Sequence, residues 1–348
     1  MWLDDVFAAF HNRIALNSDR ADQVRSANAN LARFLRQDAP LSSAYLDHFL
    51  QGSLAINTAI RPVDESEEFD SDSVFVLDLS KRPANKRSPA DVIAWIAVRL
   101  RQNPDYEGKI QERTRCVRIK YAGLFHVDLV PGRVITDVTS VLEIPSKDHG
   151  WQKSHPRGYV EWALAVDGAS NGHFNQVAKI AKHWRDIRFG KESKPKSILL
   201  TTLLGLTLKQ GSSVPQTLVL TLEATSHALA AHRIVPRVAN PSLSEENLAR
   251  DWTQDNYDVF KQKLQSAATA ARRALDLATT DRERCVSEWV KLFGGKFPRY
   301  TAADGREFRA AGLSGSLFVS PLGRVTTSEP DQPSVQATPH RFYGEEDS

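Results

Sequence analysis

Three aspartates are the residues of this sequence whose types and spacing point most directly to chemistry. Asp70 and Asp72 stand just before residues 74–79, a short apolar run rich in β-branched residues that predicts a buried strand. Side chains two residues apart in a strand project from the same face, so these carboxylates are expected to lie together. A hard divalent cation such as Mg²⁺ would relieve their repulsion, although a D-x-D pair alone is also common in ordinary turns.

A third aspartate, Asp128, lies within residues 124–130, which otherwise predict a buried apolar strand and follow another predicted strand over residues 116–121. A carboxylate is costly to bury unless it is paired or bound to a metal ion. If this strand lies beside the one that carries Asp70 and Asp72, the three carboxylates can bind two cations about 3.5–4 Å apart. The spacing therefore predicts a two-metal site built from segments that are distant along the chain.

A Gly-Ser pair about seventeen residues before the first aspartate predicts a turn that binds phosphate. Glycine lets the backbone approach a ligand closely, and Ser53 offers both a hydroxyl and a backbone N–H. The residues that follow can begin a helix, whose N-terminus favours anions. Gln51, Gly52 and Ser53 are therefore candidates for holding a nucleotide triphosphate.

The elements that must position these residues fall into an α/β half and a helical half, an order typical of two lobes around a cleft. Residues 44–50 predict a short helix or a strand. Helices are predicted over 3–16, 18–36 with Ser18 as the cap, 88–101, 173–187, 196–209, 215–234, 245–252, 256–278 and 281–293.

The C-terminal segment after residue 298 differs from both halves. It is rich in Gly, Ser, Thr and Pro, and segments of that kind rarely bury enough surface to fold alone. Residues 340–344 form an aromatic and basic island, which is interpreted either as a docking peptide or as a plain disordered terminus.

Composition limits the classes of function. The 348 residues are 41% hydrophobic and 25% charged with a net charge of +3, so there is no overall polybasic signal for nucleic acid. The acidic N-terminus does not resemble a signal peptide, and residues 197–208 are too short to span a bilayer. Cys116 and Cys285 fit no metal-binding spacing, which favours a reducing, cytoplasmic location.

The whole pattern resembles the nucleotidyltransferase superfamily that includes DNA polymerase beta. Several longer sequence segments are similar to those of the bacterial CD-NTases, which are relatives of cyclic GMP-AMP synthase that make nucleotide second messengers in anti-phage defence. The resemblance covers about residues 1–300 and rests on an ordered set of segments: GSLAINTAIRP, VRIKYAGLFHVDLVPG, AKHWRDI, KPKSILLTTLLG and WVKLFGGKFP. One departure is that Ser71 and Ser73 stand where the family often has apolar residues.

The resemblance implies an α+β, two-lobed fold with a mixed β-sheet catalytic core, a long N-terminal spine helix, placed here at residues 20–36, and a C-terminal helical lobe. The implied domains are residues 1–150 for the catalytic core, 151–298 for the helical lobe and 299–348 for a poorly structured tail.

The resemblance also implies that Lys182 and the Lys196-Ser197 pair hold the triphosphate from the helical side. Lysine neutralises phosphate as a compact charge, yet from spacing alone both lysines could equally be surface residues. His126 and His183 have no partner at ligand spacing, so ordinary hydrogen-bonded histidines are predicted there.

The implied activity is a nucleotidyltransferase reaction with two Mg²⁺ ions, or Mn²⁺ in their place. ATP and other NTPs would be joined into a cyclic di- or trinucleotide by a cytoplasmic enzyme, with an accessory regulatory or conjugating protein at the tail and no membrane partner. The alternatives are transfer to an RNA or protein acceptor, and a catalytically silent binding scaffold. An RNA-tailing enzyme would be expected to carry a basic appendage, which this sequence lacks.

Overall fold

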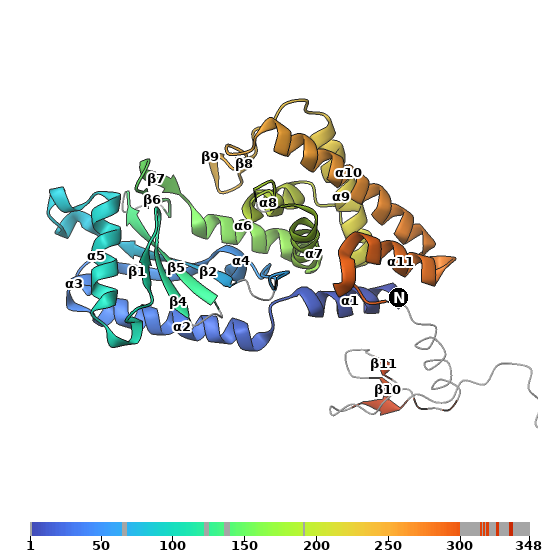
Figure 1. Cartoon of the computed structure of the whole chain (residues 1–348), viewed down its shortest axis with the longest axis horizontal. Coiled ribbons are helices and arrows are strands. Elements are labelled where there is room, and N and C mark those ends of the chain that lie inside the picture. Colours follow the sequence, from blue (N-terminus) through green and yellow to red (C-terminus); the bar gives the residue numbers. More distant parts are fainter. Residues whose placement is uncertain are drawn as a thin grey trace, which may run out of the picture.

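The computed structural model describes residues 2–64, 68–121, 125–135, 140–190 and 192–299, together with 314, 316, 318–319, 325–326 and 334–336. A sheet-based lobe and a helical lobe lie side by side in Figure 1. The predicted α+β class is therefore confirmed, with a mixed sheet in the N-terminal half and helices dominating the C-terminal half.

Among the described residues, seven strands form the main sheet in the order β1-β2-β5-β4-β3, with β6 paired to β5 and β7 to β6. The central pair, β2 and β5, is parallel, and the other pairs are antiparallel. The segment predicted as a short helix or a strand is the strand β1. The strands are β1 (Tyr45–Gln51), β2 (Phe69–Leu77), β3 (Ile110–Glu112), β4 (Val117–Tyr121), β5 (Phe125–Val134), β6 (Leu142–Ser146) and β7 (Gly150–Ser154).

The two faces of the sheet are used differently. Alternate residues of β2 and β5, including Phe75 and Val127, pack in one core with α2 (Ser18–Gln37) and α5 (Pro89–Arg101). Asp70 and Asp72 are even-numbered residues of β2 and project from the opposite face, because strand side chains alternate. The helices thus cover one side of the sheet and leave the aspartates on the other.

The two serines that depart from the family pattern lie on the helix-covered face. Ser71 and Ser73 are both fully buried, and Ser71 accepts a hydrogen bond from Asn28 of α2 at 3.2 Å. Their polarity is therefore separated from the aspartate face by the sheet itself.

Local capping explains where the helices of this lobe begin. Asn17, rather than the predicted Ser18, caps α2, because its side chain accepts a hydrogen bond from the Arg20 N–H at 3.3 Å. Ser88 caps α5 as predicted, with Pro89 in the first turn. The remaining short helices are α3 (Ala39–Ser42), α4 (Gly52–Ala55) and the 3₁₀ turns Leu79–Lys81, Ala84–Lys86, Pro104–Tyr106, Leu277–Thr279 and Gly294–Lys296.

The helical lobe has its own aromatic core, to which the first helix of the chain, α1 (Trp2–Ile14), belongs. Phe7 of α1 packs edge-on against Trp289 at 4.9 Å between ring centroids, and Phe10 lies 4.9 Å from Phe297. The other helices of this lobe are α6 (Pro156–Ala169), α7 (His173–Arg188), α8 (Ser197–Leu206), α9 (Val214–Ala230), α10 (Gln254–Asp276) and α11 (Arg282–Phe293).

The role predicted for one spine helix over residues 20–36 is divided between α1 and α2. Helix α2 packs on the sheet and α1 on the helical core, and Figure 1 shows both along the same edge of the molecule. The chain changes lobe at Ala15, which forms an isolated β-bridge with Ile60. The domain boundary at residue 150 stays a prediction, but the first helix packs with the helical lobe.

The predicted helix over residues 245–252 is wrong. Residues Ala239–Asn240 (β8) and Leu243–Asn247 (β9) form a small antiparallel hairpin. Asn247 explains the difference, because its side-chain oxygen accepts the Val238 N–H at 3.0 Å and the Ala249 N–H at 3.1 Å. These bonds hold the backbone in an extended turn that competes with helix formation.

In the C-terminal segment, the described residues include three two-residue strands: Phe318–Val319 (β10) pairs with Val325–Thr326 (β11) and with Val335–Gln336 (β12). The predicted docking island at residues 340–344 lies outside the described residues. Within the described part of the chain, no helix has both the length and the apolar character needed to cross a membrane.

Candidate active site

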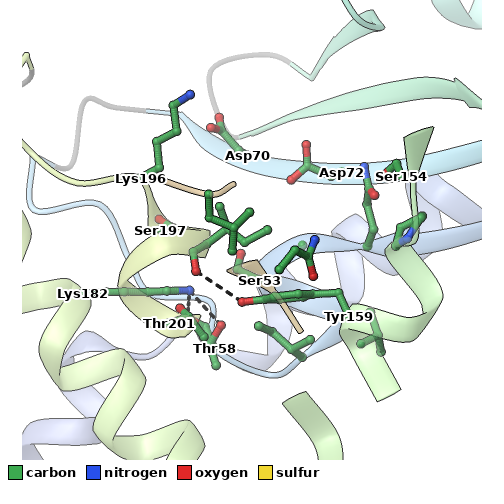
Figure 2. Close-up of a pocket in the computed structure, with 18 of the residues that line it drawn as sticks. Ser53, Thr58, Asp70, Asp72, Ser154, Tyr159, Lys182, Lys196, Ser197 and Thr201 are labelled. Atoms are coloured by element: carbon green, nitrogen blue, oxygen red, sulfur yellow. Dashed lines mark hydrogen bonds between the residues drawn. The ribbon is translucent and has the colours of Figure 1, made fainter. Parts of the chain in front are cut away.

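A cleft of about 550 Å³ lies between the two lobes. The sheet lobe lines it with the β1–α4 turn and the start of β2, and the helical lobe with α7 and the first turn of α8. Figure 2 shows Ser53, Asp70, Asp72, Lys182 and Lys196 around this one cavity.

One row of side chains crosses four strands at the edge of the cleft. Gln51 of β1 is paired with Asp72 of β2, Asp72 with Asp128 of β5, and Asp128 with Arg118 of β4. Residues paired directly across strands project from the same face, so Asp72 and Asp128 are neighbours. The distant segment that carries Asp128 is thus placed beside the D-x-D strand, as the sequence predicts.

Asp72 carries the excess negative charge of this row. Burial, and then the charges of Asp128 and Asp70, raise the pKa of Asp72 from 3.8 to about 7. Such a shift is typical of carboxylates that share a site without enough positive charge between them. A cation bound among these oxygens would relieve the part of the shift that comes from the neighbouring negative charges.

Asp70 is turned toward a histidine. One oxygen of its carboxylate lies 2.7 Å from Nε2 of His126, and Nδ1 of the same ring lies 3.1 Å from Glu68. The hydrogen bond from His126 holds the pKa of Asp70 below its ordinary value, against the opposing effect of burial. Burial is the largest single effect and lowers the pKa of His126, but the hydrogen bond and charge of Asp70, together with the bond to Glu68, make the net shift upward.

Asp128 is bound by a guanidinium. Nε and Nη2 of Arg118 each donate to a different oxygen of Asp128, both at 2.8 Å. This two-bond geometry is the strongest form of an arginine–carboxylate pair. Sequence reasoning missed Arg118 and the role of His126, because both follow from strand register rather than from local spacing.

The carboxylate oxygens of this site are ligands of the type that a hard divalent cation prefers. In the conformation seen here, however, they are not gathered around one point. All three aspartates supply oxygen donors on one face of the sheet, and the raised pKa of Asp72 reflects burial together with neighbouring negative charge. Yet among the residues that the structure describes, no three His, Cys, Asp or Glu side chains are grouped closely enough to hold an ion. Binding would require Asp70 and Asp128 to turn from His126 and Arg118.

The Gly52-Ser53 turn brings the backbone against Asp72. Gly52 has φ +68°, and a Cβ placed there would lie 2.7 Å from the Oδ2 atom of Asp72. Only glycine fits that position without strain. Gln51 precedes α4 without capping it through its side chain, and Gln51, Gly52 and Ser53 all line the cleft.

Lys182 enters the cleft from α7 as a buried amine, only 3% exposed. Its Nζ donates to the carbonyl oxygen of Thr58 at 3.1 Å and to the Thr58 hydroxyl at 2.8 Å, as Figure 2 shows. Burial, followed by the charge of Arg185, lowers the pKa of Lys182 from 10.5 to about 7. The surface-lysine interpretation therefore does not apply to Lys182, whereas it describes the exposed side chain of Lys196.

Lys196 and Ser197 stand at the start of α8. Lys196 is the N-terminal flanking residue of the helix and forms an ion pair with Asp251. The Ser197 hydroxyl accepts a hydrogen bond from Nη1 of Arg185 at 2.8 Å. Arg185 is buried and was not predicted from the sequence, although it lies in the AKHWRDI segment that carries the family resemblance.

The other residues considered in the sequence are structural. His183 is buried, and its Nε2 lies 3.0 Å from the carbonyl oxygen of Phe293, so it is a hydrogen-bonded histidine as predicted. Cys116 and Cys285 are both buried free thiols.

Paired aspartates on a mixed sheet that face a helical lobe across a cleft define the nucleotidyltransferase class, and solved structures share this fold. Escherichia coli MS115-1 CdnC with ATP superposes with a TM-score of 0.67 at 22% identity, covering 85% of this chain and 98% of that one. The Bradyrhizobium diazoefficiens CD-NTase CdnG in complex with GTP gives 0.68 at 18% identity, covering 84% and 95%.

Sequence comparisons find relatives of one functional class. Residues 1–166 match the Second Messenger Oligonucleotide or Dinucleotide Synthetase domain. A cyclic AMP-AMP-AMP synthase of an Acinetobacter species is 26% identical over 92% of this chain and 90% of that protein, and a c-di-GMP synthase of Roseivirga ehrenbergii is 25% identical over 99% and 97%. Along nearly its whole length the chain is therefore similar to bacterial enzymes that make cyclic oligonucleotides, in line with the resemblance carried by the ordered motifs.

Proposed function

We propose that this protein joins NTPs into a cyclic di- or trinucleotide in an Mg²⁺-dependent reaction. The single observation that carries the proposal is the strand register that sets Asp72 beside Asp128, opposite the Gly52-Ser53 turn, in a chain whose first 166 residues match a second-messenger synthetase domain.

The reaction is transfer of a nucleotidyl group to a ribose hydroxyl. The hydroxyl oxygen attacks the α-phosphorus of an NTP, the bond to the β-phosphate breaks, and pyrophosphate leaves. In this proposal Asp128 orients or deprotonates the attacking hydroxyl. Bound to Asp70, Asp72 and Asp128, two Mg²⁺ ions, or Mn²⁺ in their place, would supply charge neutralisation on the phosphates and a lowered hydroxyl pKa.

The triphosphate is held from both lobes in this proposal. On the sheet side, the Gly52-Ser53 backbone and the Ser53 hydroxyl offer donors next to Asp72. On the helical side, Lys182, Lys196 and Ser197 line the same cleft. Lys182 is charged when phosphate is bound, because a nearby anion favours the protonated amine.

The cyclic nature of the product is carried over from relatives that match nearly the whole chain. Those relatives are a cyclic AMP-AMP-AMP synthase, a c-di-GMP synthase and a cyclic AMP-AMP-GMP synthase. Ring closure requires a further transfer, the second for a dinucleotide and the third for a trinucleotide, in which the terminal hydroxyl of the linear intermediate attacks the α-phosphorus of its own 5′ triphosphate and releases pyrophosphate.

The cellular setting follows from the same relatives as part of the proposal. We place the enzyme in the cytoplasm, in anti-phage signalling. E. coli CdnC has been solved in complex with HORMA-deltaN. We extend this to an accessory regulatory or conjugating protein that binds this chain, with residues 299–348 as its docking segment.

Incubation of the purified protein with four labelled NTPs and Mg²⁺ tests the proposal. Small products that resist phosphatase, identified by mass spectrometry, are expected, and Asp70→Ala or Asp72→Ala should abolish both these products and pyrophosphate release in a folded protein. Labelled RNA or labelled protein would instead show a different acceptor, and absence of turnover with every NTP would favour the silent scaffold.

A further inference from the structure

The guanidinium of Arg118 lies at one end of the carboxylate row, bonded to Asp128. It closes the row Gln51, Asp72, Asp128 and Arg118 across four strands, at the end away from the phosphate turn. Arg118 is partly buried, with 23% of its side chain exposed, and that of Asp128 is 15% exposed. The pair is therefore shielded from solvent more than an ordinary surface ion pair.

We propose that Arg118 serves as an internal counter-ion that competes with divalent metal for Asp128, so that metal loading of this site requires the Arg118–Asp128 pair to open. This inference rests on the proposed function, since it concerns the same three aspartates.

The geometry supplies the first argument. Both oxygens of Asp128 accept a bond from Arg118, at 2.8 Å each. A carboxylate held in this fork presents its best-placed lone pairs to the guanidinium rather than to a metal ion. Arginine stays charged at every physiological pH, so the competition does not disappear by deprotonation.

Charge supplies the second argument. The positive charge of Arg118 acts on Asp70 and Asp72 as well as on Asp128, and it opposes the rise in the pKa of Asp72. One side chain therefore stabilises all three carboxylates when no metal is bound. A divalent ion entering the same row would lie close to a fixed positive charge and be repelled by it.

The proposal explains why the donors fail to converge. Of the described residues, no trio of His, Cys, Asp or Glu forms a metal-binding group, although Asp72 and Asp128 are paired in register. With Asp128 held by Arg118, Asp72 lines the cleft, and among the described residues no ion pair joins it to a cation.

Metal binding to Arg118→Gln tests the proposal without any turnover. Mn²⁺ affinity, measured by electron paramagnetic resonance titration of free Mn²⁺, is expected to tighten about tenfold, which corresponds to ~1.4 kcal/mol. In the same variant, the metal-free protein is expected to melt at a lower temperature, because three carboxylates lose their counter-ion. Unchanged or weaker Mn²⁺ binding would overturn the proposal and make Arg118 a positioning residue.

Arg133→Gln is the matched control. Arg133 also pairs with a carboxylate across neighbouring strands, bonding to Glu143 at 2.6 Å, but it lies outside the row that contains Asp72 and Asp128. Its loss should lower stability and leave Mn²⁺ affinity unchanged. If Arg118→Gln does not fold, Arg118→Lys carries the test, because lysine keeps the charge but cannot form the fork. A gain in Mn²⁺ affinity smaller than tenfold is then expected, and the absence of any gain would reject the proposal.

Asp72→Ala separates this proposal from the function on which it rests. If the wild type binds Mn²⁺ and Asp72→Ala does not, the aspartates form the metal site, and the Arg118 result alone decides the competition. If Asp72→Ala binds Mn²⁺ as well as the wild type does, the site assignment itself fails, and the proposal about Arg118 fails with it.

Discussion

At the residue scale, two side chains of the cleft carry charges that are unfavourable unless a ligand is bound. Asp72 lies among negative charges, and Lys182 is buried without a carboxylate partner among the described residues. Each would be stabilised by a ligand of the opposite sign, a cation for Asp72 and a phosphate for Lys182. Their pKa shifts therefore predict how stability changes with pH in the ligand-free protein.

Asp72→Asn is expected to stabilise the metal-free protein at high pH. The folded-state pKa of Asp72 is raised from 3.8 to about 7, so its favourable contribution is complete below pH 3.8 and is lost as pH rises through 7. The gain from Asn should be roughly 1–2 kcal/mol at pH 8, since one pKa unit corresponds to ~1.4 kcal/mol and the site can relax. Urea denaturation in chelator at pH 5 and pH 8 measures it, and a gain larger at pH 5 than at pH 8 would contradict the assignment.

Lys182→Met is expected to stabilise the nucleotide-free protein and to weaken its response to nucleotide. The pKa of Lys182 falls from 10.5 to about 7, so the cost of its buried charge is complete below pH 7 and fades toward pH 10.5. The gain should be roughly 1–3 kcal/mol at pH 6 and smaller at pH 9.

Chemical denaturation at both pH values, and thermal shifts with a non-hydrolysable ATP analogue, measure the effects of Lys182→Met. The exposed Lys209 of the same lobe provides the control, because Lys209→Met should alter neither quantity. If Lys182→Met keeps the full thermal shift with the analogue, Lys182 does not contact the triphosphate.

At the element scale, the β1–α4 turn joins the phosphate-binding backbone to the carboxylate row. Glycine is required at position 52 for two reasons: the backbone has a positive φ, and the side chain of Asp72 takes the space that a Cβ would need. A turn of this kind fixes the distance between the nucleotide and the aspartates without any long side chain. The sequence identifies the Gly-Ser pair, but only the pairing of β1 with β2 places it against Asp72.

Gly52→Ala is expected to destabilise the protein and abolish product formation. Alanine strains the backbone at φ +68° and places its Cβ 2.7 Å from the Oδ2 atom of Asp72, which must move. Gly108→Ala is the matched control, because Gly108 has φ +70° and no atom within 4 Å of an added Cβ.

The control should cost ~1 kcal/mol or more from backbone strain alone and keep full activity. The two costs are compared by denaturant unfolding and the activities by pyrophosphate release. Equal losses of stability and equal activity in the two variants would show that the contact with Asp72 is unimportant.

At the scale of the whole molecule, the chain builds two cores and crosses between them at a few points. Helix α1 belongs to the helical core, whereas α2 belongs to the sheet core. Lys182 of α7 bonds to Thr58, which follows the phosphate turn, and Ser242 of the β8–β9 turn donates to the carbonyl oxygen of His155 at 3.0 Å. The cleft is thus held by contacts from elements that are far apart in sequence.

Phe10→Ala is expected to weaken the helical lobe by about 3–5 kcal/mol, because it removes a fully buried ring from the aromatic core. Hydrogen exchange should speed up in α7 and α11, which pack with α1, while β2 and β5 keep their protection. Equal loss of protection in both lobes would show that the two cores unfold as one unit.

The sequence by itself indicated most of the elements and the family resemblance. Local periodicity indicated the strands that carry Asp72 and Asp128, and the caps and glycines indicated most helices, because these signals act within a few residues. Where a local pattern competed with side-chain bonds from other segments, as at Asn247, the prediction of a helix was wrong. The division of the spine between α1 and α2 also depended on which core each helix could bury its apolar face against.

Only the tertiary structure decided which charges meet. The pairing of Arg118 with Asp128, of His126 with Asp70, and the burial of Lys182 against Thr58 all arise from strand register and lobe packing. Register depends on the packing of whole faces and turns, so no spacing along the chain encodes it. The residue types were thus readable in the sequence, while their electrostatic states were set by the fold.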